Sequence, residues 1–171
     1  MPLDYQVKKL KNGLTCLYVP MDTPGSACSN IIYKIGSANE RPGEEGLAHF
    51  WEHLFHKGSV KYNKNTAGGC ITDLELKGGI ENATTSFFRT NYFLTVPWNF
   101  IPDVIAREAD RMKDIDRKLL IEGLGTECTV VENELERGKG NPMRTMMAAL
   151  NKHAFQRAKI RKSTIGDYGP L

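Results

Sequence analysis

Residues 47–57 of this 171-residue chain read LAHFWEHLFHK and are followed by Gly58. Apolar residues recur at helical spacing through the segment, and glycine is the residue most often found just past the end of a helix. The segment therefore predicts a helix over residues 47–57. His49 and His53 are four residues apart, so both imidazoles project from one face of that helix, about 5–6 Å apart at Cβ.

These two histidines have the spacing of metal ligands. Two imidazoles so placed can each bind one ion at about 2.0–2.1 Å, which leaves room for a third protein ligand and a water. Glu52 borders the same face and can contact that water, and the order H-x-x-E-H is the inverse of the commoner H-E-x-x-H zinc signature. The alternative is an ordinary helix that carries these residues by chance. Only four histidines occur in the chain, so the ligand spacing of two of them favours a zinc site.

The acidic segment 127–137 (ECTVVENELER) is the expected source of the third ligand, and we predict that it is helical. On a helical wheel Glu127 and Glu134 lie on the edge that faces the core, whereas Glu132 and Glu136 point outward. A core-facing carboxylate is unfavourable unless it is paired or bound to a metal. Glu127 or Glu134 should therefore complete the site, with the other orienting a histidine. The spacing alone does not decide between them.

Two histidines, one carboxylate and an open fourth position describe a catalytic zinc site rather than a structural one. Zinc would lower the pKa of its water toward about 7 and polarise a substrate carbonyl. Glu52 would accept the proton and later return it to the leaving amine. The expected reaction is amide hydrolysis.

The rest of the chain predicts strands mixed with helices without strict alternation. Expected strands cover residues 13–20, 27–35, 80–86 and 90–96, and further helices cover residues 70–76, a segment starting at residue 102, and 142–155. The helix that starts at Pro102 is expected to bury Val104, Ile105, Ala109 and Met112. We predict an α+β fold with a mixed, mostly antiparallel sheet and helices packed on one face.

Composition limits the class of protein. Lys and Arg number 23 against 20 Asp and Glu, and hydrophobic residues make up 40%, which excludes a disordered chain or a disulfide-dense miniprotein. No apolar run approaches the roughly 20 residues that span a bilayer. The four cysteines (Cys16, Cys28, Cys70 and Cys128) form no metal-binding pair and are expected to be buried free thiols.

Residues 137–162 contain eight Lys or Arg and no acidic residue. We interpret this segment as the polar face of a helix with an apolar stripe of Met143, Met146, Met147, Leu150 and Ala154. Aromatic residues do not interleave with the basic ones, so nucleic-acid binding is not expected.

Several stretches together resemble the pitrilysin/insulinase (M16) family of zinc peptidases, which includes the mitochondrial processing peptidases. The matching stretches are GSANERPG (36–43), GLAH (46–49), NATTS (82–86), TNY (90–92), EADRM (108–112), VVENE (130–134) and TIG (164–166). The resemblance covers nearly the whole chain. It implies one zinc ion per domain, with His49, His53 and Glu134 as ligands and Glu127 as their support.

The resemblance also implies a substrate site and a mode of action. In the family an extended peptide adds itself to the edge of the strand over residues 80–86, and Asn82 and Ala83 are the residues carried over. The expected function is a zinc endopeptidase acting on extended or unfolded peptides, with Glu52 as general base. The alternative is a non-catalytic subunit or docking domain of the same fold, although such relatives usually lose the metal motif.

The family pattern differs from this chain at a few positions. His56 replaces an aromatic or aliphatic residue, and we expect it to be a polar surface histidine rather than a ligand. Trp51 is bulkier than its counterpart. The interval from His53 to Glu134 is a few residues longer than usual, which an insertion near residues 62–69 or 119–125 would accommodate.

Family enzymes are assembled from several such domains that close around the substrate. Residues 1–171 resemble only the first, metal-bearing domain, so we expect one peptidase domain that is a fragment of a longer protease. Its expected partners are peptide substrates and other domains or subunits of the family. We expect the isolated chain to bind zinc but to cleave peptides weakly or not at all. No secretory signal is visible, and likeness to bacterial envelope members favours a periplasmic or otherwise extracytoplasmic location.

Overall fold

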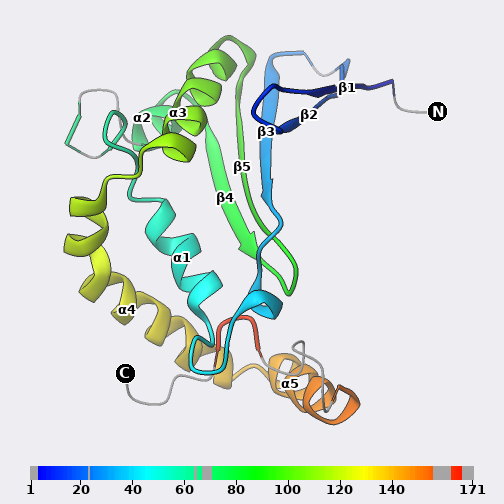
Figure 1. Ribbon diagram of the computed structural model, residues 1–171, viewed down its shortest axis with the longest axis vertical. Helices are drawn as coiled ribbons and strands as arrows, with labels where there is room; N and C mark the ends of the chain where they lie inside the picture. The colour runs from blue at the N-terminus through cyan, green and yellow to red at the C-terminus, as the bar shows by residue number, and fades with distance from the viewer. Residues whose placement is uncertain (1–3, 23, 64, 67–70, 156–162, 167–171) are drawn as a thin grey trace.

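The computed structural model describes residues 4–22, 24–63, 65–66, 71–155 and 163–166 (Figure 1). Five strands and five α-helices are found in this part of the chain, together with two short 3₁₀ helices, η1 (Ser37–Asn39) and η2 (Trp98–Phe100). The strands are β1 (Gln6–Lys9), β2 (Thr15–Tyr18), β3 (Ser26–Tyr33), β4 (Ile80–Thr85) and β5 (Thr90–Pro97). The helices are α1 (Leu47–Phe55), α2 (Ile71–Leu76), α3 (Ile101–Lys113), α4 (Arg117–Lys139) and α5 (Pro142–Ala154).

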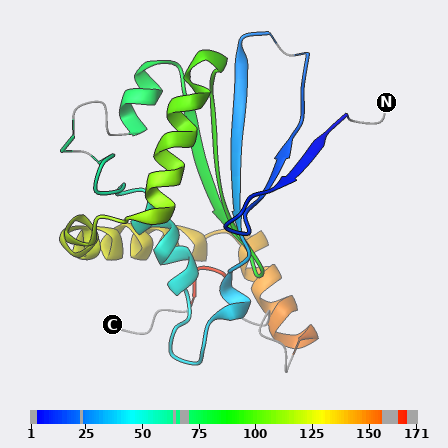
Figure 2. The same ribbon diagram turned by 45° about the horizontal axis from the view of Figure 1, so that its top comes forward.

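A three-stranded antiparallel sheet in the order β3-β5-β4 forms the centre of the molecule. Helices α1, α2 and α3 cover one of its faces, and α4 packs across α1 on the side away from the sheet (Figures 1 and 2). The predicted α+β class, with antiparallel strands and helices on one face, is confirmed. β2 does not join this sheet; it pairs with β1 in a separate antiparallel hairpin.

The hydrophobic core lies between β5 and helices α2 and α3. Leu74, Leu94, Val96 and Val104 form its most buried cluster. The predicted buried face of α3 is wrong except at Val104, because Ile105 and Met112 are exposed. Arg111 is buried instead. Its guanidinium lies over the rings of Phe55 and Tyr92, at 4.4 and 5.0 Å from their centroids. The guanidinium also donates a hydrogen bond to the carboxylate of Glu108. The ion pair and the cation–π contacts together let an arginine occupy the inner face of the helix.

Helix α4 begins ten residues before the predicted start. The Asp116 side chain accepts hydrogen bonds from the backbone N–H groups of Lys118 and Leu119, so it caps the helix. Residues 119–125, one of the two places where an insertion relative to the family pattern was expected, are therefore continuous helix. Helix α4 places Glu127 and Glu134, the two candidate carboxylates, beside α1.

Helix α5 carries the expected apolar stripe of Met143, Met146, Met147 and Leu150, and all four side chains are exposed. The cysteines are not the buried thiols expected: Cys16 and Cys28 are free and exposed, and Cys128 is free and partly buried. Cys70 and the basic residues at 157–162 lie outside the described residues. Among the described residues, no helix is both long and apolar enough to cross a membrane.

Candidate metal centre

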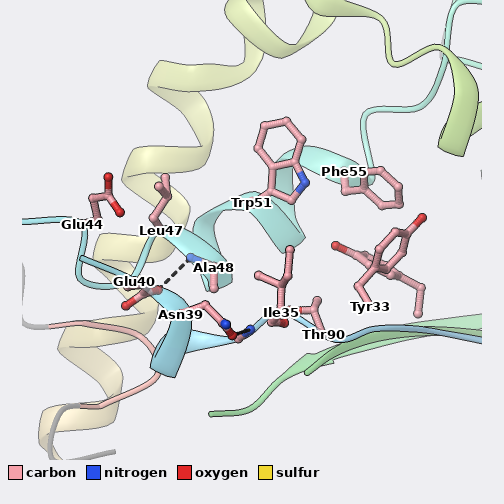
Figure 3. A pocket seen from close by; sticks show the side chains of 12 residues that line it. Tyr33, Ile35, Asn39, Glu40, Glu44, Leu47, Ala48, Trp51, Phe55 and Thr90 are labelled. Atoms are coloured by element: carbon pink, nitrogen blue, oxygen red, sulfur yellow. Dashed lines mark hydrogen bonds between the residues drawn. The ribbon is translucent and has the colours of Figure 1, made fainter. Parts of the chain in front are cut away.

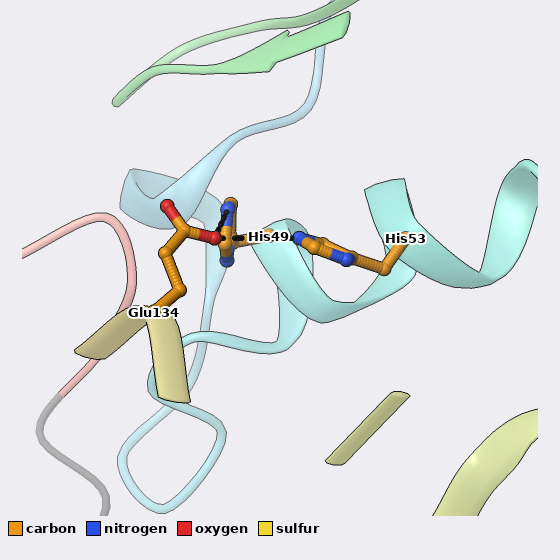
Figure 4. Close-up of side chains that lie close together, drawn as sticks. All are labelled: His49, His53 and Glu134. Atoms are coloured by element: carbon orange, nitrogen blue, oxygen red, sulfur yellow. Dashed lines mark ion pairs between the residues drawn. The ribbon is translucent and has the colours of Figure 1, made fainter. Parts of the chain in front are cut away.

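Three side chains converge where α4 crosses α1 (Figure 4). The Nε2 atoms of His49 and His53 each lie 3.6 Å from Oε2 of Glu134. One ligand atom from each of the three residues lies within 4.8 Å of the other two. The structure therefore brings together the two histidines predicted as ligands and one of the two candidate carboxylates. Of Glu127 and Glu134, it is Glu134 that faces both imidazoles.

The start of α1 is fixed by a carboxylate from the preceding loop. Glu40 accepts hydrogen bonds from the backbone N–H groups of Gly46 and Ala48, at 3.0 and 2.8 Å. An acidic group at this position satisfies free N–H groups of the helix and interacts favourably with its dipole. Gly46 has a φ of 90°, which favours glycine. His49 lies in the turn fixed in this way.

The three donors suit zinc. Ligands placed tetrahedrally about 2.1 Å from one ion are separated by about 3.4 Å from each other, close to the two distances of 3.6 Å found here. Burial lowers the pKa of His49 below its ordinary value of 6.5, although the Glu134 carboxylate acts in the opposite direction. A lowered pKa favours the neutral imidazole, which is the form that binds a metal. Nitrogen and carboxylate donors in this number are typical of catalytic zinc sites.

A second carboxylate contacts the outer nitrogen of one histidine. Oε2 of Glu127 lies 3.3 Å from Nδ1 of His53, and the Lys57 ammonium donates to Oε1 of the same carboxylate. Glu127 is 8% exposed and Glu134 is partly buried, whereas Glu132 and Glu136 are exposed, as the helical wheel predicts. Glu127 therefore contacts the histidine from the side opposite to Glu134.

Glu52 is buried on the side of α1 that faces the sheet, with 8% of its surface exposed. The hydroxyl of Thr85, at the end of β4, donates a hydrogen bond to Oε2 of Glu52. The Glu52 carboxylate also acts electrostatically on His49. It thus lies between the candidate metal ligands and the end of β4.

The backbone of β4 is open on one side. Within the described part of the sheet, β4 pairs with β5 alone. The N–H of Ser86 donates to the carbonyl of Arg89 in the connecting turn. Because alternate residues of an antiparallel strand bond to the partner, Ala83 directs its N–H and C=O to the free edge. Its N–H is bonded to Oδ1 of Asn82 at 2.8 Å.

The inner face of β4 runs alongside α1. Thr85 contacts Glu52, and Glu81 lies 3.2 Å from Nδ1 of His56. His56 is thus paired with Glu81, whose side chain is largely buried, and is itself partly buried, rather than the surface histidine expected, and it lies outside the three-residue group. The free edge at Ala83 consequently lies between two contacts with the metal-site helix.

A separate apolar pocket of about 450 Å³ lies on another face of α1 (Figure 3). Trp51, Phe55 and Ala48 from α1 face Tyr33 and Ile35 from β3 and the residues after it. This pocket does not include any of the three candidate metal ligands.

Sequence reasoning missed two residues that contact the site. Thr85 is identified only by the hydrogen bond that it donates to Glu52. Lys57 has a weak signal in the sequence, because it is four residues after His53 and therefore near the same side of α1. Neither residue type suggests metal chemistry by itself.

The fold and the His-His-Glu group are those that the sequence predicts for a zinc-peptidase domain. Residues 20–168 match the family model described as Insulinase (Peptidase family M16), and the chain belongs to that family. This result confirms the resemblance inferred from the sequence.

Relatives and solved structures agree with this assignment. The chain is 31% identical over 97% of its length to an "Uncharacterized zinc protease" of Rickettsia bellii, of which it covers 39%. It is 32% identical over 67% of its length to "Protease 3" of Escherichia coli, of which it covers 12%. The structure superposes on that of a protease from Helicobacter pylori with a TM-score of 0.84 and 28% identity, covering 96% of this chain and 39% of that one. For pitrilysin the TM-score is 0.80 at 27% identity, with coverage of 96% and 17%. The chain thus spans well under half of each of these proteins.

Proposed function

We propose that this chain is the metal-bearing domain of a zinc endopeptidase that hydrolyses peptide bonds in extended or unfolded segments. His49, His53 and Glu134 would hold one zinc ion, Glu127 would orient His53, and Glu52 would be the general base. The observation that carries the proposal is the convergence of three metal-binding side chains beside an open strand edge. Membership of a family whose relatives are named zinc proteases supports it.

Zinc, when bound, lowers the pKa of a coordinated water toward about 7 and polarises a carbonyl. Glu52 accepts the proton of the attacking water and donates it to the leaving amine. Thr85 donates a hydrogen bond to one oxygen of Glu52, which leaves the other oxygen available for the proton. The low exposure of Glu52 keeps competing solvent away from this carboxylate.

Peptide binding would use the free edge of β4. An added strand would exchange hydrogen bonds with the N–H and C=O of Ala83 and displace the Asn82 side chain from the N–H that it now covers. Main-chain pairing does not require one particular sequence, so the edge suits substrates defined by being extended. The small side chain of Ala83, on the face that contacts α1, leaves room for the substrate beside Glu52.

The principal test is the substitution Glu52→Gln, with zinc content and cleavage of an unstructured peptide measured on the same preparations. The variant should retain zinc, because Glu52 is not a ligand, and should lose peptide cleavage by about 100-fold or more. Equal cleavage by both proteins, measured after the remaining domains are supplied and the unsubstituted protein cleaves the peptide, would contradict the mechanism.

Turnover also depends on what surrounds this domain. The chain covers only 39% of its Rickettsia relative, so we propose that residues 1–171 form one domain of a larger protease and that other domains or subunits complete the substrate site. The isolated chain would then bind zinc and peptide with weak cleavage. Zinc and peptide binding without any cleavage, even after the remaining domains are supplied, would support the docking-domain alternative.

A further inference from the structure

Lys57 and Glu127 form an ion pair across the contact between α1 and α4. The Lys57 ammonium donates to Oε1 of Glu127, while Oε2 of the same carboxylate lies 3.3 Å from Nδ1 of His53. The side chains of Lys57, Glu127 and His53 are 29%, 11% and 20% exposed. The two oxygens of Glu127 are thus divided between a cation and a histidine that faces the metal site.

Helix α4 has a glycine where the lysine side chain crosses it. A Cβ atom built on Gly123 would lie 3.0 Å from Cε of Lys57, 3.5 Å from its Cδ and 3.6 Å from its Cγ. A Cβ atom at 3.0 Å from Cε is closer than ordinary van der Waals contact, so a larger residue at this position would require the lysine stem to shift by a few tenths of an ångström. Gly123 is also one helical turn before Glu127, which places the lysine stem directly on the path to that carboxylate.

The geometry at His53 depends on this pair. A carboxylate beside Nδ1 holds the proton on that nitrogen and leaves Nε2 free to bind a metal. Nearly buried carboxylates need a partner, and Lys57 supplies it from the side opposite to His53. Nδ1 of His49, by contrast, is buried with no hydrogen-bond partner among the described residues. Of the two histidines, His53 is therefore the one whose ring orientation depends on other side chains, namely Glu127 and Lys57.

We propose that Lys57 is a positioning residue of the metal centre: it holds Glu127 against His53, so that His53 presents Nε2 to zinc, and Gly123 provides the room for the lysine side chain. The proposal rests on the zinc site proposed above. In the described part of the chain the Lys57 ammonium pairs with Glu127 and forms no ion pair with Glu134, so it acts through Glu127.

The test measures the zinc dissociation constant of the full 171-residue chain by competition with a chromophoric chelator. Lys57→Met removes the ammonium but keeps the length of the stem, and it should weaken zinc binding by about 10-fold or more, as the loss of outer-shell partners does. Lys118→Met removes a lysine that is 85% exposed and should leave the constant unchanged. Unchanged zinc affinity in Lys57→Met would overturn the proposal.

A second pair of variants tests the same idea without removing the charge. Gly123→Leu places a side chain against Lys57, whereas Gly125→Leu adds one where no atom lies within 4 Å. The first should weaken zinc binding and the second should not. Equal affinities in the two variants would contradict the role of Gly123.

A double-mutant cycle tests whether Lys57 acts through Glu127. If Lys57 acts through Glu127, Lys57→Met should have no further effect on zinc affinity in a Glu127→Gln background. The same fold loss in both backgrounds would overturn the proposal. Failure of the unsubstituted chain to bind zinc would refute the metal centre itself, whereas equal zinc binding by the unsubstituted chain and Lys57→Met would refute only the role of Lys57.

Discussion

Among the described residues, Glu134 supplies the one carboxylate that contacts both histidines, so Glu134→Gln is the sharpest perturbation of the proposed metal centre. The substitution keeps the shape of a side chain that is 37% exposed and removes its charge. Apparent zinc-binding free energies of small zinc domains are about 10–16 kcal/mol for four protein ligands, or roughly 3 kcal/mol for each. A loss of roughly 3 kcal/mol raises the dissociation constant by about 100-fold.

This difference is measurable as a zinc-dependent shift in melting temperature. Free zinc at about 100 times its dissociation constant stabilises the folded chain by about 2.7 kcal/mol. In a domain of this size that gain raises the Tm by roughly 5–11 °C. At the same zinc concentration the variant would be half saturated, would gain about 0.4 kcal/mol, and would shift by roughly 1–2 °C.

The assay is differential scanning calorimetry of the chelator-treated protein with and without zinc. Glu132→Gln is the matched control, because Glu132 is an exposed acidic residue on the same helix, and it should keep the full shift. A zinc-dependent shift of the same size in Glu134→Gln and in the unsubstituted chain would refute the ligand assignment.

Three further predictions concern the core, the titration of His49 and the substrate edge. Leu74 is fully buried in the main hydrophobic cluster, so Leu74→Ala should lower the free energy of unfolding by about 2–5 kcal/mol. Urea denaturation measures this loss, with Leu76→Ala as a control at an exposed leucine. A smaller loss in Leu74→Ala than in Leu76→Ala would contradict the core assignment. Burial lowers the pKa of His49 in the folded chain. Between that lowered pKa and the ordinary histidine pKa of about 6.5, the unfolded chain therefore binds more protons than the folded chain. The stability of the zinc-free chain that depends on His49 should be fully present above that pH and lost as the pH falls through the lowered pKa, and His49→Gln should flatten the profile; identical profiles in urea titrations would contradict the shift. Ala83→Pro removes an N–H that faces the free edge, a position where a sheet tolerates proline, so the variant should keep its zinc binding and its Tm. It should bind a fluorescent extended peptide about 10-fold more weakly, because one main-chain hydrogen bond is lost. Unchanged peptide affinity in anisotropy titrations would exclude strand addition at this residue.

The sequence was most informative where one periodic pattern and one chemical pattern coincided. Helix α1 was predicted from its apolar spacing and its terminal glycine, and the positions of His49, His53 and Glu52 on it followed from helical geometry. The core-facing positions of Glu127 and Glu134 followed from the same periodicity. Which glutamate faces both histidines depends on how α4 crosses α1, and that crossing is a tertiary contact without a local signal.

The errors have specific physical causes. β1 was missed because three of the four residues of Gln6–Lys9 are polar and all four are exposed, so its pairing with β2 leaves no hydrophobic alternation. The first turns of α4 were missed because Gly123 and Gly125 weaken the helical pattern, and the capping by Asp116 was not recognised. The inner face of α3 was misplaced because Arg111 is buried through an ion pair with Glu108 and contacts with aromatic rings, which a hydrophobicity pattern cannot predict.

The proposed metal centre can be tested directly by anomalous diffraction at the zinc absorption edge, from crystals of the chain grown with zinc. We expect one zinc ion bonded to Nε2 of His49, Nε2 of His53 and a carboxylate oxygen of Glu134, each at about 2.0–2.2 Å. A crystal in which these three side chains hold no zinc, or in which the ion lies at His56 and Glu81 instead, would contradict this expectation.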